Sequence, residues 1–102
     1  MPTPARRPSP VDSLAPGSRW TDDEVSFDAP DALTEAACRT VWEISAALRA
    51  RRGMTDMSIS ELAAAAGVRR QTVSGVLDGT TWPDLVTVAR LAKVLGRRVT
   101  VA

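Results

Sequence analysis

The sequence predicts an all-α fold: a compact domain of four helices, with a flexible N-terminal tail and a short C-terminal β-strand. Beyond residue 30, apolar residues recur at three- and four-residue steps, as on one face of a helix. Residues of helix-capping types bound these stretches, and six of the seven prolines lie within residues 1–30. A chain of 102 residues suffices for one modest core. We therefore expect a tail at 1–30, a helical domain at 31–96 and a strand at 97–102.

The tail has few large apolar residues before Trp20, so it cannot bury enough surface to offset the entropy of ordering. Trp20 and Phe27 stand among acidic residues, a mixture typical of segments that dock onto a partner protein. The alternative is that both rings fold back onto the domain. We favour the alternative, because a small domain gains stability from the extra buried area.

The first helix is expected at 32–52. Its apolar stripe consists of Leu33, Ala37, Val41, Ile44 and Leu48. Arg49, Arg51 and Arg52 fall in its last turn, where cations interact favourably with the helix dipole, and Gly53 can adopt the left-handed C-cap conformation.

The second helix has a well-formed start. Ser58 is the expected N-cap and Glu61 its capping-box partner, while Met57 and Leu62 occupy the hydrophobic-staple positions. We expect this helix to end at Gly67.

A third, short helix is expected at about 70–77, closed by Asp78 and Gly79. The fourth begins after an N-cap at Asp84 and ends at Gly96. Its predicted buried face consists of Leu85, Val88, Leu91, Ala92 and Leu95.

Residues 98–101 alternate in strand fashion, with no second strand in the chain to pair with. A second copy of the chain is the simplest partner, so we expect a homodimer formed through Val99 and Val101.

Several function classes are disfavoured. The chain has no histidine and only one cysteine, Cys38, which excludes disulfide frameworks, metal sites built on these residues and histidine-dependent triads. Asp22, Asp23 and Glu24 are adjacent acids, but their polar setting suits solvated carboxylates better than catalysts. We expect no enzymatic activity, metal or cofactor. Without a bilayer-spanning run or a signal-peptide core, the expected location is cytoplasmic, with no membrane partner.

The charges divide unevenly along the chain. Residues 1–38 carry three arginines against seven acids, a net −4, and residues 39–102 carry ten basic residues against five acids, a net +5. A basic folded half is what a nucleic-acid-binding protein needs.

Residues 62–76 have the organisation of a helix-turn-helix. Ala63 is small where two helices would cross closely, and Gly67 permits a positive-φ turn between them. Val68, Val73 and Val76 anchor the second of these helices by its inner face. Its outer face then remains free to enter a DNA major groove.

The segment Ser-Ile-Ser-Glu-Leu-Ala-Ala-Ala-Ala-Gly-Val-Arg-Arg-Gln-Thr-Val-Ser-Gly-Val-Leu-Asp-Gly resembles the Xre family, the Cro and phage-repressor helix-turn-helix group. The flanking segments Leu48–Gly53 and Pro83–Gly96 are also similar to that family, so the resemblance covers about residues 33–96.

The resemblance implies a double-stranded DNA ligand, with base contacts from Arg70, Gln71, Thr72 and Ser74. Gly75 offers no side chain to this face, and Arg69 stands where the family usually places a Ser or Thr N-cap. The expected phosphate contacts are Arg69, Ile59, Ser60, Thr80, Thr81, Arg49 and Arg52, with Arg51 as a further helper. Surface arginines that only stabilise the helix dipole are the alternative for the last three.

Three functional hypotheses follow. The first is a dimeric repressor that presents two recognition helices about 34 Å apart to a palindromic site. The second is an antitoxin, because a helix-turn-helix followed by a short strand resembles antitoxins that partner HipA-type kinases; the tail or the domain's flank would hold the toxin. The third is a protein-interaction adaptor that has lost DNA binding.

Overall fold

The computed structural model describes residues 8–97 and confirms the all-α prediction. Its elements are a 3₁₀ helix, η1 (Pro10–Ser13), and the α-helices α1 (Ala32–Thr55), α2 (Ile59–Ala66), α3 (Arg70–Asp78) and α4 (Leu85–Val94). Apart from Arg97, the expected C-terminal strand with Val99 and Val101 lies outside the described residues. None of the helices in residues 8–97 is long and apolar enough to cross a membrane.

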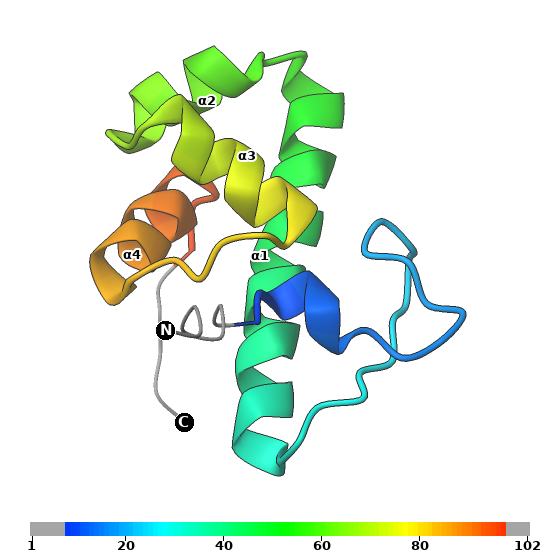
Figure 1. Ribbon diagram of the computed structural model, residues 1–102. Coiled ribbons are helices and arrows are strands. Elements are labelled where there is room, and N and C mark those ends of the chain that lie inside the picture. Colours follow the sequence, from blue (N-terminus) through cyan, green and yellow to red (C-terminus); the bar gives the residue numbers. More distant parts are fainter. Residues whose placement is uncertain (1–7, 98–102) are drawn as a thin grey trace, which may run out of the picture.

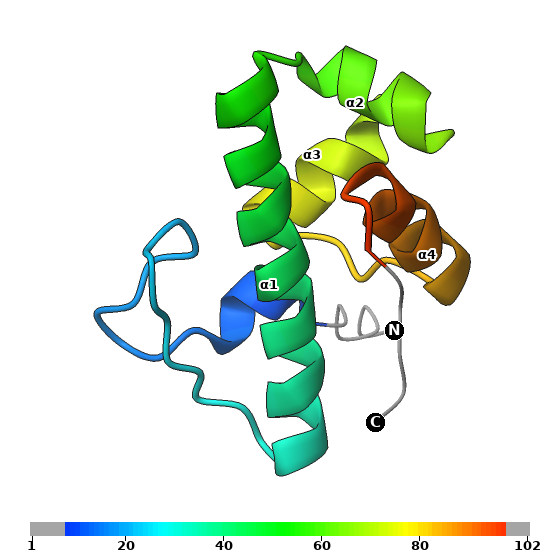
Figure 2. The same cartoon turned by 180° about the vertical axis from the view of Figure 1, so that it is seen from behind.

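The long helix α1 organises the molecule. The helices α2, α3 and α4 gather on one side of it, and the chain between residues 15 and 28 loops out on the other side (Figure 1). The reverse view shows the same separation (Figure 2). α3 packs against both α1 and α2, α4 packs against α2, and η1 packs against α1.

The end of α1 differs from the prediction. The helix continues through Gly53 to Thr55, and the left-handed C-cap is Asp56, with φ +55°. The Asp56 N–H closes the last turn by donating to the Arg52 carbonyl at 2.8 Å. Aspartate tolerates the left-handed region better than most residues. The assignment of Gly53 as the C-cap was therefore wrong.

The buried face of α1 is also shifted from the predicted stripe. It consists of Cys38, Val41, Ser45 and Leu48. Val41 and Leu48 confirm the prediction, but Leu33 is 85% exposed and Ala37 is exposed. The first turns of α1 extend past the helices that cover its C-terminal half, so they have little to pack against (Figure 1).

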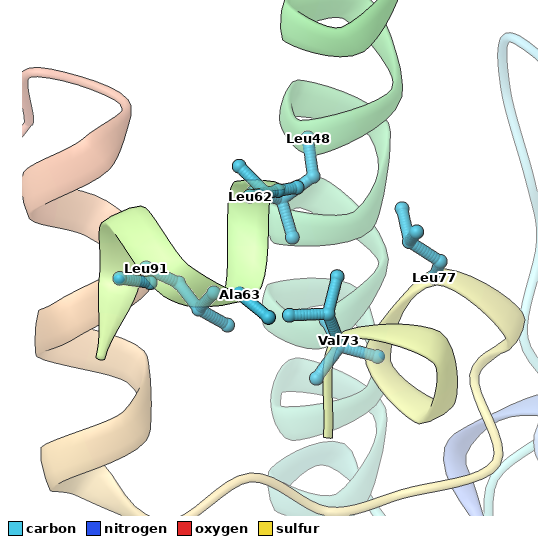
Figure 3. Close-up of a cluster of buried hydrophobic side chains, with 8 residues drawn as sticks. Leu48, Leu62, Ala63, Val73, Leu77 and Leu91 are labelled. Atoms are coloured by element: carbon cyan, nitrogen blue, oxygen red, sulfur yellow. The ribbon is translucent and has the colours of Figure 1, made fainter. Parts of the chain in front are cut away.

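The remaining helices enclose the core. Its buried residues are Leu48, Leu62, Ala63, Ala66, Val73, Val76, Leu77 and Leu91, several of them labelled in Figure 3. The Ser58–Glu61 capping box is present, and Asp84 caps α4 by accepting from the Thr87 N–H. Leu85 was wrongly predicted to be buried: at the first position of α4 it is 72% exposed.

Residues 8–30, here called the strap, differ from the flexible tail that we expected. Trp20 and Val25 are buried, and the Trp20 and Phe27 rings meet edge to face with centroids 6.4 Å apart. Backbone hydrogen bonds close the strap on itself, among them an isolated antiparallel bridge between Leu14 and Phe27. The preferred interpretation of the tryptophan, that it folds back onto the domain, is what the structure shows. A few buried aromatic contacts, with backbone bonding, order a segment that composition alone marks as flexible.

Candidate nucleic-acid interface

The turn between α2 and α3 has the predicted geometry. Gly67 adopts φ +69°, and the Val68 N–H donates to the Ala63 carbonyl at 3.0 Å. Ala63 itself is only 4% exposed, and Figure 3 shows it directed into the interior with Val73 and Leu91. A larger side chain at Ala63 would push the two helices apart.

The helix α3 has two contrasting faces. Val73, Val76 and Leu77 are buried, while Arg70 and Gln71 are exposed on its first turn. Neither exposed side chain forms a hydrogen bond or ion pair with any other residue in the described part of the chain. These two donors are thus available to a ligand.

The other two predicted base-contacting residues, Thr72 and Ser74, are half-buried. They lie at the margins of the exposed face rather than at its centre. Among the four predicted base-contacting residues, Arg70 and Gln71 therefore offer the most accessible side-chain donors.

The start of α3 lacks a side-chain cap, as the sequence indicated. Arg69 is the N-cap residue and forms no capping hydrogen bond. Its side chain is exposed. A guanidinium beside the uncapped amides at the positive end of a helix dipole is a suitable arrangement for an anion.

Gly75 is not a gap in the exposed face. It is buried in α3, and a Cβ added there would lie 2.8 Å from Thr81 Cβ and even closer to Thr81 Oγ1. The Thr80 N–H also donates to the Gly75 carbonyl at 2.9 Å. Because Gly75 has no side chain, the loop after α3 can lie directly against the helix. We expected Gly75 on the exposed, DNA-facing side of α3, and the structure instead buries it under this loop.

Four further predicted phosphate contacts lie in two places. At the start of α2, Ser60 is exposed, whereas Ile59 is half-buried and packs against the core. Only the backbone N–H of Ile59 can therefore serve a phosphate. In the loop after α3, Thr80 is exposed and Thr81 is half-buried.

Two of the α1 arginines expected to contact phosphate, Arg49 and Arg52, have intramolecular partners, whereas Arg51 is exposed. Arg49 donates to Ser45 Oγ at 2.9 Å and to the Trp20 carbonyl at 3.5 Å. Arg52 donates through Nε to the Met57 carbonyl at 3.1 Å, which ties the link before α2 back to α1. Both side chains are half-buried.

The acidic part of the strap lies away from α2 and α4. Asp22, Asp23 and Glu24 fall within the loop that extends on the side of α1 opposite to α2 and α4 (Figures 1 and 2). The segment that would repel a polyanion thus lies on the other side of α1 from α2 and α4 (Figures 1 and 2).

The family comparison agrees with this geometry. The profile described as helix-turn-helix matches residues 47–101, more than half of the chain. The chain belongs to the helix-turn-helix family. This helix-turn-helix protein is accordingly a DNA-binding regulator, and its family is one of DNA-binding domains rather than of catalytic ones. The match begins inside α1, so the strap and the first half of α1 lie outside it. No curated protein and no solved structure matches the chain.

Sequence reasoning missed the role of Ser45. Its hydroxyl is fully buried, accepts from Trp20 Nε1 at 3.0 Å and donates to the Leu77 carbonyl at 3.0 Å. The signal was its spacing, because Ser45 stands four residues after Val41 and three before Leu48, on the face that both of them bury.

Proposed function

We propose that this protein is a sequence-specific transcriptional repressor that binds DNA as a dimer and inserts α3 into the major groove. The observation that carries the proposal is the contrast across α3: Arg70 and Gln71 are exposed and unpaired within residues 8–97, while the opposite face is buried against the core. A helix held by one face and polar on the other is what groove recognition requires.

The proposed base contacts follow from side-chain chemistry. Arg70 can donate two hydrogen bonds to guanine O6 and N7, and Gln71 can pair with adenine N6 and N7. Thr72 and Ser74 would contact base edges or thymine methyl groups at the margins of the face.

The proposed phosphate contacts surround this face. They are Arg69, the amides of Ile59 and Ser60, and the loop residues Thr80 and Thr81, from the start of α2 and from the segments on either side of α3. The Thr80 hydroxyl donates to the Gly75 carbonyl at 3.5 Å in the free protein, so it would have to turn to reach a phosphate. Arg49 and Arg52 would contribute only through donors not already used within the protein.

Dimerisation is proposed through Val99 and Val101, with two α3 helices placed about 34 Å apart on a palindromic site. Sedimentation of the full chain and of a variant lacking residues 97–102 tests this step. A dimer that survives the deletion would place the interface elsewhere.

The deciding experiment is selection of bound sequences from a random duplex pool, followed by affinity measurements on the selected site. Arg70→Ala and Gln71→Ala should each cost about 1–3 kcal/mol and relax preference at one base pair. Arg19→Ala, which removes an exposed arginine from the strap, is the matched control and should bind normally. Binding should also weaken steeply with salt. Failure to select any sequence, or an affinity independent of salt, would overturn the proposal.

The antitoxin hypothesis needs a surface for a toxin. The tail and the domain's flank were the two expected surfaces. Trp20 and Val25 of the tail are buried within the protein's own fold, which favours the repressor over an antitoxin that holds its toxin through the tail. The exposed Arg70 and Gln71 likewise argue against an adaptor without DNA binding.

A further inference from the structure

We propose that the strap positions the loop after α3 for phosphate contact, with Trp20 as the positioning residue. The loop in question comprises Gly79–Trp82 and carries Thr80 and Thr81. This inference rests on the proposed DNA-binding function and adds to it a part of the chain that lies outside the family match.

The indole of Trp20 covers the first residue of the loop. A Cβ built on Gly79 would lie 2.6 Å from both Cδ2 and Cε2 of the ring. Gly79 is also the left-handed C-cap of α3, with φ +72°. Only glycine can adopt this left-handed conformation without strain and also leave room for the ring.

Two hydrogen bonds join the strap to the two ends of the loop. The Val11 N–H donates to the Gly79 carbonyl at 2.8 Å, and Trp82 Nε1 donates to the Pro8 carbonyl at 2.7 Å. Figure 1 shows the beginning of η1 beneath this loop, next to α1.

The opposite side of the loop rests on α3. The Thr80 N–H and the Thr80 hydroxyl both donate to the Gly75 carbonyl, at 2.9 and 3.5 Å, and the Thr81 side chain lies against Gly75. The loop is therefore held between the strap on one side and α3 on the other. The two threonines of the loop therefore keep a defined position relative to Arg70 and Gln71 of α3.

Ser45 fixes the position of Trp20 in turn. The hydroxyl accepts from the indole and donates to the Leu77 carbonyl near the end of α3. Arg49 reinforces this junction by donating to both the Ser45 hydroxyl and the Trp20 carbonyl. The indole thus links α1, the end of α3 and the loop, and a change at Trp20 reaches the threonines without altering Arg70.

The test compares full-length wild type, Trp20→Ala and Trp20→Phe on the selected DNA site, with phosphate ethylation interference as the main readout. In Trp20→Ala we expect interference to be lost at the phosphates next to the loop and retained at those next to Arg69. Affinity should fall about tenfold, equivalent to loss of one hydrogen bond to a charged group. The salt dependence should stay unchanged, because threonines release no counterions. Trp20→Phe keeps a ring over Gly79 and should restore the interference pattern.

A double-mutant cycle separates positioning from general destabilisation. In a Thr80→Ala/Thr81→Ala background, Trp20→Ala should weaken DNA binding much less than it does in the wild type, because the contacts it acts through are already gone. Leu91→Val, a core change in α4, is compared at the same folded fraction and should leave the interference pattern intact.

Full additivity in the cycle, or folded Trp20 variants with wild-type affinity and interference, would overturn the positioning role while leaving DNA binding established. A wild type that selects no DNA sequence would instead overturn the proposed function, and the positioning role with it.

Discussion

The indole N–H of Trp20 donates a 3.0 Å hydrogen bond to the hydroxyl of Ser45, 25 residues further along the chain. Both residues are buried, and the same hydroxyl reaches the end of α3 through the Leu77 carbonyl. One serine thereby joins the strap, α1 and α3.

Ser45→Ala should lower the free energy of unfolding by about 1–3 kcal/mol, because it leaves a buried indole N–H and a buried carbonyl without their partner. Urea denaturation followed by circular dichroism measures the change. Ser60→Ala, at an exposed position in α2, is the control and should shift stability by less than about 0.5 kcal/mol. Equal effects of the two substitutions would contradict the assigned role of the hydroxyl.

Arg69→Ser should change stability and DNA binding in opposite directions. Serine at this position can cap α3 and should raise the free energy of unfolding by up to about 1 kcal/mol, while loss of the arginine should weaken DNA binding and reduce the salt slope by about one. Ser58→Ala, which removes an existing cap, provides the converse and should destabilise by about 1 kcal/mol. Thermal melts and binding titrations measure the two effects. A fall in both the stability and the DNA affinity of Arg69→Ser would refute the prediction.

Two glycines inside helices should respond to alanine with opposite signs. A Cβ at Gly53 in α1 meets nothing within 4 Å, so Gly53→Ala should stabilise the protein by about 0.5–1 kcal/mol. Gly75→Ala in α3 would collide with Thr81 and should destabilise by about 1–3 kcal/mol despite its better helix propensity. Denaturation of the two variants side by side checks the pair, and a stabilised Gly75→Ala would show that the loop can move away at no cost.

The cap of α4 should make stability depend on acid. The Thr87 backbone N–H, with its side chain, holds the pKa of Asp84 below the ordinary value for aspartate. A lowered folded-state pKa means that the contribution to stability is present above the unfolded pKa of about 3.9 and is lost as the pH falls through the folded value. Asp84→Asn keeps a capping oxygen without titrating. Melting temperatures between pH 2 and 6 should therefore fall less for this variant than for the wild type.

Asp31 caps α1 in the same way, since the Thr34 N–H lowers the pKa of its carboxyl. Part of the acid dependence should consequently persist in Asp84→Asn. Identical pH profiles for wild type and variant would contradict a contribution from the Asp84 cap.

Local sequence signals predicted the helix-turn-helix well because its determinants lie close together in the chain. The Ser58–Glu61 box spans one turn, and Gly67 and Gly79 each end a helix at a residue suited to positive φ. The apolar spacing of α3 also gave its buried face, which left Arg70 and Gln71 outside.

What the sequence could not supply depended on contacts distant in the chain. Gly53 looked like a C-cap on local grounds, but the structure places Asp56 in that role. Leu33 and Leu85 match an apolar helical period, yet within residues 8–97 both side chains are exposed at the starts of their helices. The partners of Trp20 include Gly79 and Ser45, and no local rule identifies residues so far apart in sequence as neighbours.

The packing of the strap also decides where a minimal functional fragment of this protein can begin. A fragment trimmed to the helical region at residue 31, or to the family match at residue 47, would leave Gly79 without the ring that covers it and the Leu77 carbonyl next to an open surface. Residue 47 would also cut α1 in half and remove Ser45 altogether. Because the Pro8 carbonyl accepts from Trp82 Nε1, the shortest fragment that keeps every contact between the strap and the loop starts at residue 8. DNA-binding assays on shorter fragments would report the properties of a different surface.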